Sequence, residues 1–231
     1  IIASLAPEPF PIAWIAESLE IEPSQANTIL ASLADFCLLH RAGIGPALRY
    51  QVAHAYVHSL SRILPSSAKT ADRLESALVQ HITSLVGELR VPYSPAQEQL
   101  STLLPHLRQF VEQQAVEEFV IGERIVRNLI DLGSTVLPDH AALALQHGVF
   151  DILRSYFANR LQSDPSNSEW QRDLVVSELR LATIALKAEL PETAALHFGK
   201  CLTILKTLRG RGVHFDPQME AVYDELIKMV E

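Results

Sequence analysis

The sequence predicts a mainly α-helical protein that begins with a small mixed α/β domain. From about residue 70 to the end, apolar residues recur every three or four positions, the spacing of amphipathic helices. Short β-like segments and a turn cluster occur only before Pro65. The 231 residues are 48% hydrophobic and include two cysteines, so a core without a disulfide framework is expected. We predict two domains, residues 1–67 and residues 68–231.

The first domain is predicted to contain two helices and a hairpin. Helical spacing of apolar residues indicates one helix from residue 12 and a second helix from Pro23. A turn cluster at residues 43–46 then separates two short segments of β character, residues 38–41 and 48–53. Two helices followed by a hairpin form the skeleton of a winged helix. This small α+β fold is therefore expected at the N-terminus.

Helical periodicity continues to the end of the chain. A predicted helix over residues 54–64 leads into the linker Pro65-Ser66-Ser67. The patterns Ser94-x-x-Gln97 and Ser168-x-x-Gln171 predict capping boxes, and Pro105 predicts a kink or a restart within a helix. Helices joined by short turns are typical of stacked α-hairpins. The expected helices span about residues 71–89, 95–111, 121–132, 142–156, 170–187 and 191–208, with a last one from about residue 216.

The last predicted hairpin carries a recognisable spacing of small and aromatic residues. Ala182, Ala194, Phe198 and Cys201 follow each other in the order small, small, aromatic, small. This spacing resembles a tetratricopeptide repeat, and residues 164–174 resemble an inter-repeat segment of bacterial tetratricopeptide proteins. The resemblance implies that Ala182 lies where two helices cross closely and that Phe198 fills the gap beside it.

Two positions of this hairpin depart from the repeat, and both cysteines are expected to be packing residues. Glu178 stands where the repeat usually has Trp or another bulky residue, and Ala185 stands where it has Tyr. Cys37 and Cys201 lie in apolar helical patterns without a catalytic context. We therefore expect both thiols to be small buried hydrophobic groups.

A second resemblance covers the N-terminal part. Residues 30–39, with Leu30-Ala31-Ser32-Leu33 leading to Leu38-Leu39, and residues 49–57 resemble the winged-helix domain of STAND proteins, the signalling NTPases that include the NB-ARC family. Leu104-Pro105-His106-Leu107 resembles a segment that often follows this domain. A winged helix followed by tetratricopeptide-like helices is the usual order in that family. The NTPase itself is missing, because the sequence has no G-x-x-x-x-G-K-S/T phosphate-binding loop.

His54 is the residue to which the resemblance assigns a ligand. In STAND proteins a Met-His-Asp motif ends the strand after the hairpin, and its histidine contacts the diphosphate of ADP. The corresponding triplet is Ala53-His54-Ala55, which keeps only the histidine. The resemblance implies nucleotide sensing by His54 in a parent protein that binds ADP or ATP, and no cofactor in this chain. The alternative is that His54 is an ordinary packed or surface histidine.

A metal site and DNA binding are both disfavoured. His54 and His58 share a helix face, but a zincin has Glu where Ala55 stands, and a third ligand is missing. The predicted second helix contains no Lys or Arg, and the hairpin offers only Arg41 and Arg49. Since phosphate contacts supply most of the affinity for DNA, nucleic acid is not the expected partner. The net charge of −8, from 19 basic and 27 acidic residues, agrees with this.

Two clusters of charged residues also occur in the sequence. The basic cluster Lys206, Arg209 and Arg211 is expected to complement a helix C-terminus and a solvated loop, with a phosphate or acidic-peptide site as the alternative. Four acidic residues are expected on a solvated helix face, with no catalytic pair among them. These are Glu112, Glu117, Glu118 and Glu123.

The chain is expected to be a cytoplasmic fragment of a larger protein. It begins with Ile1 instead of Met, and its first residues lack the basic region of a signal peptide and contain three prolines. No apolar run reaches the length of about 18 residues that a membrane span needs.

The predicted function is that of a non-catalytic regulatory module of a STAND-type NTPase. Its helical array would bind a protein or peptide, and its winged helix would couple this event to an upstream nucleotide-binding domain. The alternative is a DNA-binding winged-helix transcriptional regulator with a helical effector domain. A hydrolase that uses His54 or His58 is the least favoured class, because no metal or nucleophile cluster accompanies them.

Overall fold

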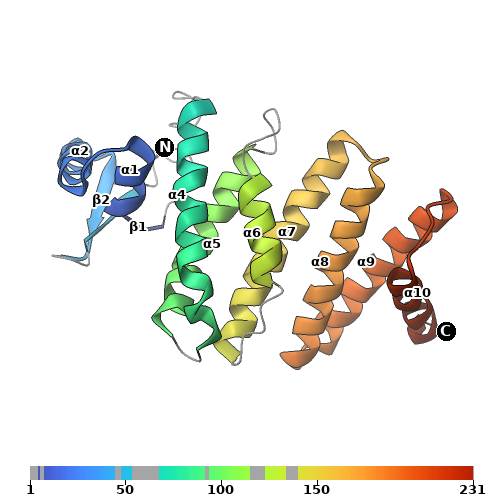
Figure 1. The fold of residues 1–231 in the computed structure, drawn as a ribbon. Helices are drawn as coiled ribbons and strands as arrows, with labels where there is room; N and C mark the ends of the chain where they lie inside the picture. The colour runs from blue at the N-terminus through green and yellow to red at the C-terminus, as the bar shows by residue number, and fades with distance from the viewer. Residues whose placement is uncertain are drawn as a thin grey trace. The chain divides into compact units, whose positions relative to one another are not determined.

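The computed structural model describes residues 5, 8–44, 48–53, 68–91, 94–114, 123–133 and 140–230 (Figure 1). Within these residues the protein is mainly helical with a small antiparallel sheet, as the sequence predicts. Contacts divide the chain into two compact units, Ile1–Pro138 and Asp139–Glu231. The first unit thus includes helices beyond the predicted first domain. The boundary predicted between residues 67 and 68 adjoins residues outside the described ranges and stays a prediction.

The first unit begins with a three-stranded sheet and two helices (Figure 1). The predicted hairpin is present, and the central strand of the sheet also pairs with a strand that the sequence did not indicate, with Phe10 opposite Tyr50. Both of these side chains are buried, and the Tyr50 hydroxyl donates a hydrogen bond of 2.9 Å to Asn27 Oδ1. In sheet order the strands are β1 (Phe10–Pro11), β3 (Arg49–Val52) and β2 (Leu39–Ala42), and the helices are α1 (Ile12–Leu19) and α2 (Pro23–Asp35).

Cys37 is not a buried core residue, contrary to the sequence-based expectation. Helix α2 ends at Asp35, and Cys37 lies in the turn that follows, with a φ of 58° in the left-handed region. The helical periodicity therefore stops before this residue, and its thiol is exposed.

Three helices and a short 3₁₀ turn make up the rest of the described first unit. Helix α5 runs from Pro95 to Gln114 and contains Pro105, so of the two predicted alternatives the restart is wrong and the kink stays a prediction. The side-chain hydrogen bond predicted for the capping box at Ser94 is not formed, because Ser94 Oγ has no partner among the described residues. The backbone carbonyl of Ser94 instead accepts a hydrogen bond from Gln97 N. The elements are α4 (Ala68–Val86), η4 (Glu88–Arg90), α5 (Pro95–Gln114) and α6 (Glu123–Gly133).

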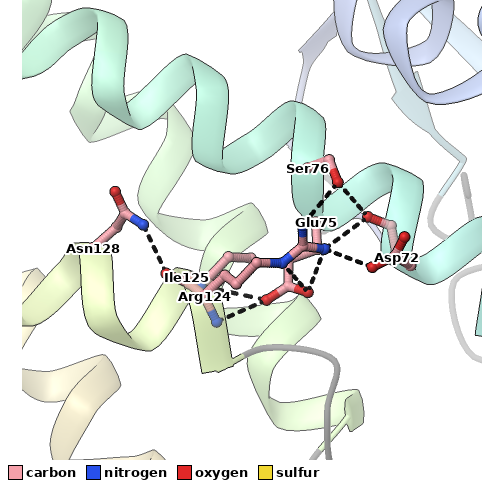
Figure 2. Close-up of polar contacts among 6 residues, drawn as sticks. All are labelled: Asp72, Glu75, Ser76, Arg124, Ile125 and Asn128. Carbon is pink, nitrogen blue, oxygen red and sulfur yellow. Dashed lines mark hydrogen bonds and ion pairs between the residues drawn. The ribbon is translucent and has the colours of Figure 1, made fainter.

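A buried carboxylate ties α4 to the first turn of α6 (Figure 2). Glu75 Oε1 accepts hydrogen bonds from the backbone N–H groups of Arg124 at 3.0 Å and Ile125 at 3.4 Å. Its Oε2 accepts from Arg124 Nη2 at 3.1 Å, and Asp72 accepts from the same nitrogen at 2.6 Å. Glu75 thereby satisfies donors that the start of a helix leaves unpaired, and it places negative charge at the positive end of the helix dipole.

The second unit consists of helices in its described residues, and neighbouring helices pack in chain order. Asn167 caps α8 by accepting from Trp170 N at 3.1 Å, while Gln171 Nε2 donates to Pro165 O. The predicted capping box at Ser168 is therefore wrong by one residue, since Ser168 is already inside the helix. No described helix is long and apolar enough to cross a membrane. The helices are α7 (His140–Ser163), α8 (Ser168–Lys187), α9 (Pro191–Gly210) and α10 (Pro217–Val230).

Candidate functional site

The four repeat-like residues all lie on the α8–α9 hairpin. Ala182 and Ala194 are almost completely buried in this pair of packed helices, and Phe198 is half-buried against the core of the second unit. Cys201 is fully buried, which confirms its expected packing role, and its thiol lies 3.5 Å from the carbonyl oxygen of Val175. Burial and then the nearby charge of Glu178 raise the pKa of the Cys201 thiol to about 12. A thiol held protonated in this way is a packing group and not a nucleophile.

A buried polar cluster lies inside the same hairpin. The Glu178 carboxylate of α8 is 5% exposed, and its Oε2 lies 2.5 Å from His197 Nδ1 of α9. Lys200 Nζ lies 3.9 Å from the other carboxylate oxygen. The sequence had marked Glu178 only as a departure from the repeat. The signal for a partner was its position four residues before Ala182, on the apolar face of α8, where an unpaired carboxylate would be costly.

A groove of about 590 Å³ opens beside these helices. It is lined by α7 residues, by the C-terminal turns of α8 and by the start of α9. Ala185 lines it with a small side chain at the position where a tetratricopeptide repeat usually has Tyr. The apolar lining is interrupted by His147, Lys187 and Glu189, so the groove offers apolar contact together with hydrogen-bonding and charged groups. The main apolar residues are Leu143, Ile184 and Leu190.

A smaller apolar hollow of about 200 Å³ lies between α9 and α10. Phe198 and Leu226 line it, together with Leu186 and Met229, which are 51% and 64% exposed. Leu190, which lines the larger groove, is also more than half exposed. Exposed large apolar side chains that gather beside a hollow are typical of surfaces that contact another protein.

The basic cluster near the end of α9 is largely engaged in structural contacts. The Arg209 guanidinium forms an ion pair with Glu220 and lies 4.6 Å from the centre of the Tyr223 ring. Arg211 Nη1 donates a hydrogen bond of 2.8 Å to Pro165 O. An anion bound here would compete with these contacts, and Lys206 is the exposed cation that remains.

The outer face of α2 carries little that would bind a phosphate backbone. Arg41 forms an ion pair of 2.9 Å with Asp35, and the hydroxyls of Thr28 and Ser32 donate to carbonyls of their own helix. Ile29 is 44% exposed on this helix. The surface is therefore close to neutral and partly apolar.

Some of the predicted site residues lie outside the part of the chain that the structure describes. His54 and His58 lie outside the described residues, as do Glu117 and Glu118. Glu112 is exposed on α5, as expected for a solvated face. Within the described part of the chain, no group of three or more His, Cys, Asp or Glu side chains is arranged to hold a metal ion.

Comparisons with protein families, curated proteins and solved structures gave no match for this chain.

Proposed function

We propose that this chain is a non-catalytic regulatory module in which a winged helix precedes tetratricopeptide-like helices, as in STAND-type signalling NTPases. The helical part binds a protein or peptide, and the winged helix transmits this event to a nucleotide-binding domain. His54 would contact ADP or ATP held by that domain. The observation that carries the proposal is the groove of about 590 Å³ beside α8 and α9.

The composition of the groove supports a peptide ligand. Leu143, Ile184 and Leu190 provide apolar surface, while His147 and Lys187 at the same groove can donate hydrogen bonds. Binding sites of this kind combine an apolar lining with a few polar groups that fix orientation. The rigid backbone of packed helices holds these groups in place before the ligand arrives, which lowers the entropic cost of binding.

A peptide library displayed on phage tests this function. Selection on the wild-type chain is expected to yield peptides that lose binding to Ala144→Trp, because the indole would fill the groove that Ala144 lines. Ala144 is exposed, so the substitution should leave the fold intact. Ala221→Trp, at an exposed position of α10, is the matched control and should keep binding. Peptides that bind all three proteins equally would contradict a site in this groove.

A DNA-binding transcriptional regulator is the alternative, and the neutral face of α2 argues against it. Fluorescence anisotropy with duplex DNA separates the two functions. We expect no binding stronger than that of other acidic proteins, since phosphate neutralisation dominates DNA affinity. Sub-micromolar binding that weakens steeply with salt would favour the alternative.

A further inference from the structure

An aromatic cluster joins the sheet part of the first unit to its long helices. The Trp14 ring of α1 contacts His81 of α4 and His106 of α5 edge-on, with ring centroids 5.6 Å and 5.2 Å apart. Phe10 of β1 contacts the same His106 ring at 6.4 Å. Two histidines on α4 and α5 thus pack against β1 and α1.

The hydrogen bonding of His106 favours its neutral form. Its side chain is completely buried, and Nε2 lies 3.4 Å from the carbonyl oxygen of Pro9. This contact assigns the proton to Nε2, and Nδ1 has no partner among the described residues. The indole N–H of Trp14 is also buried without a partner in the described residues. Because it is a donor only, it could not accept a hydrogen bond from the Nδ1–H that protonation would add to His106.

Protonation would therefore place an unpaired N–H and a positive charge in an apolar contact. Burial lowers the pKa of His106 to about 4, although the Pro9 carbonyl acts in the opposite direction. Burial also lowers the pKa of His81, and the positive charge of Arg49 on β3 adds to this effect. Both rings resist protonation while β1 and α1 stay packed on α4 and α5.

Within the described residues, no carboxylate forms an ion pair with His106 or His81. One carboxylate oxygen of Glu8, before β1, is buried without a partner in the described residues, and Nδ1 of His106 is unpaired as well, so no hydrogen bond joins this nitrogen to Glu8 in the closed state. Partial desolvation raises the pKa of Glu17 of α1, which lies at an exposed position. Glu20, at the end of α1, is paired with Arg73 of α4 at 2.8 Å.

We propose that the packing of β1 and α1 against α4 and α5 is a pH-sensitive latch, closed at neutral pH and opened when His106 and His81 become protonated. This device goes beyond peptide binding, because it controls the first unit without any ligand in the α8–α9 groove. In an acidic environment, a larger fraction of molecules would have β1 and α1 detached from the helices and Trp14 exposed to solvent.

Hydrogen exchange of the wild-type chain at pH 7.5 and pH 5, corrected for the intrinsic rates, tests the latch. We assume that the pKa of His106 is about 4 in the closed state and has the ordinary value near 6.5 in the open state. Protonation of His106 alone then predicts a roughly 30-fold loss of protection in α1. Protection in α8 and α9 should change much less. The proposal would be overturned if both units lost protection equally or if protection did not change. It would also be overturned if α1 became better protected at pH 5, because Glu8 would then pair with the imidazolium.

Substitution identifies the groups responsible. His106→Gln keeps an amide donor for the Pro9 carbonyl and removes the titration, so most of the pH response of α1 should disappear. His214→Gln changes an exposed histidine of the second unit and should leave the response intact. Emission of Trp14 in a Trp170→Phe background should shift to longer wavelength at pH 5 in the wild-type sequence and not with His106→Gln. A response that survives in His106→Gln at full size would contradict the assignment.

Discussion

Replacing Glu75 by Ala should be one of the most destabilising changes in the first unit. The Glu75 carboxylate is 1% exposed and accepts hydrogen bonds from two backbone N–H groups and from the guanidinium of Arg124 (Figure 2). Alanine would leave the N-terminus of α6 uncapped and the Ile125 N–H buried without this acceptor. It would also remove the ion pair that joins α4 to α6.

The size of the effect follows from these contacts. Loss of a helix cap costs about 1 kcal/mol, and a buried donor left unpaired costs about 1–3 kcal/mol. The ion pair adds about 1 kcal/mol or less, because the Arg124 side chain is 46% exposed. Since these contributions overlap, we expect Glu75→Ala to lower the free energy of unfolding by about 3 kcal/mol. Glu75→Gln keeps an acceptor oxygen and should cost about 1 kcal/mol.

Urea unfolding followed by Trp14 fluorescence in a Trp170→Phe background measures this effect in the first unit. Asp72→Ala is the matched control, because Asp72 contacts the same guanidinium but is 61% exposed and should cost about 0.5 kcal/mol or less. A Glu75→Ala protein within about 0.5 kcal/mol of the parent would refute the reasoning. Equal effects of Glu75→Ala and Asp72→Ala would also contradict it, because burial would then not matter.

Four further predictions address other parts of the chain. Ala182→Leu should overpack the α8–α9 contact and cost about 1–3 kcal/mol; an unchanged melting temperature would argue against the repeat assignment. Glu178→Ala should cost about 2 kcal/mol by leaving His197 buried without its acceptor, measured by urea unfolding against Glu178→Gln, which should retain more stability. Between pH 7.5 and pH 5 the free energy of unfolding should fall by about 2 kcal/mol because of His106. At pH 5 the imidazole is protonated in the unfolded chain but stays neutral in the folded chain, where its pKa is about 4. His106→Gln should remove most of this fall. Under the proposed function, His54→Ala should change the stability of this chain little, and it should weaken ADP retention and raise basal activity in a full-length STAND-type parent. Equal ADP occupancy after purification and equal activity would make His54 an ordinary packing residue.

The sequence by itself determined the local structure. Apolar spacing of three and four residues depends on the helix repeat alone, and it located the helices that the structure describes in both units; the helix predicted over residues 54–64 lies outside the described residues. The turn cluster after residue 42 likewise indicated the β2–β3 hairpin, whose strands are close in the chain. Small residues at repeat spacing were sufficient to predict that Cys201 is buried.

Tertiary structure alone decided the contacts between distant residues. Strand β1 is two residues long and contains a proline, so it has no pattern of its own and exists because Phe10 meets Tyr50. Glu75 meets Arg124, Glu178 meets His197, and Trp14 meets the imidazole of His106 only after the helices pack. Only Glu178 stands out in the sequence, as a charged residue on an apolar helix face, and even there the sequence does not name the partner. Their hydrogen bonds and titration depend on burial, which is a property of the packed helices and not of any single segment.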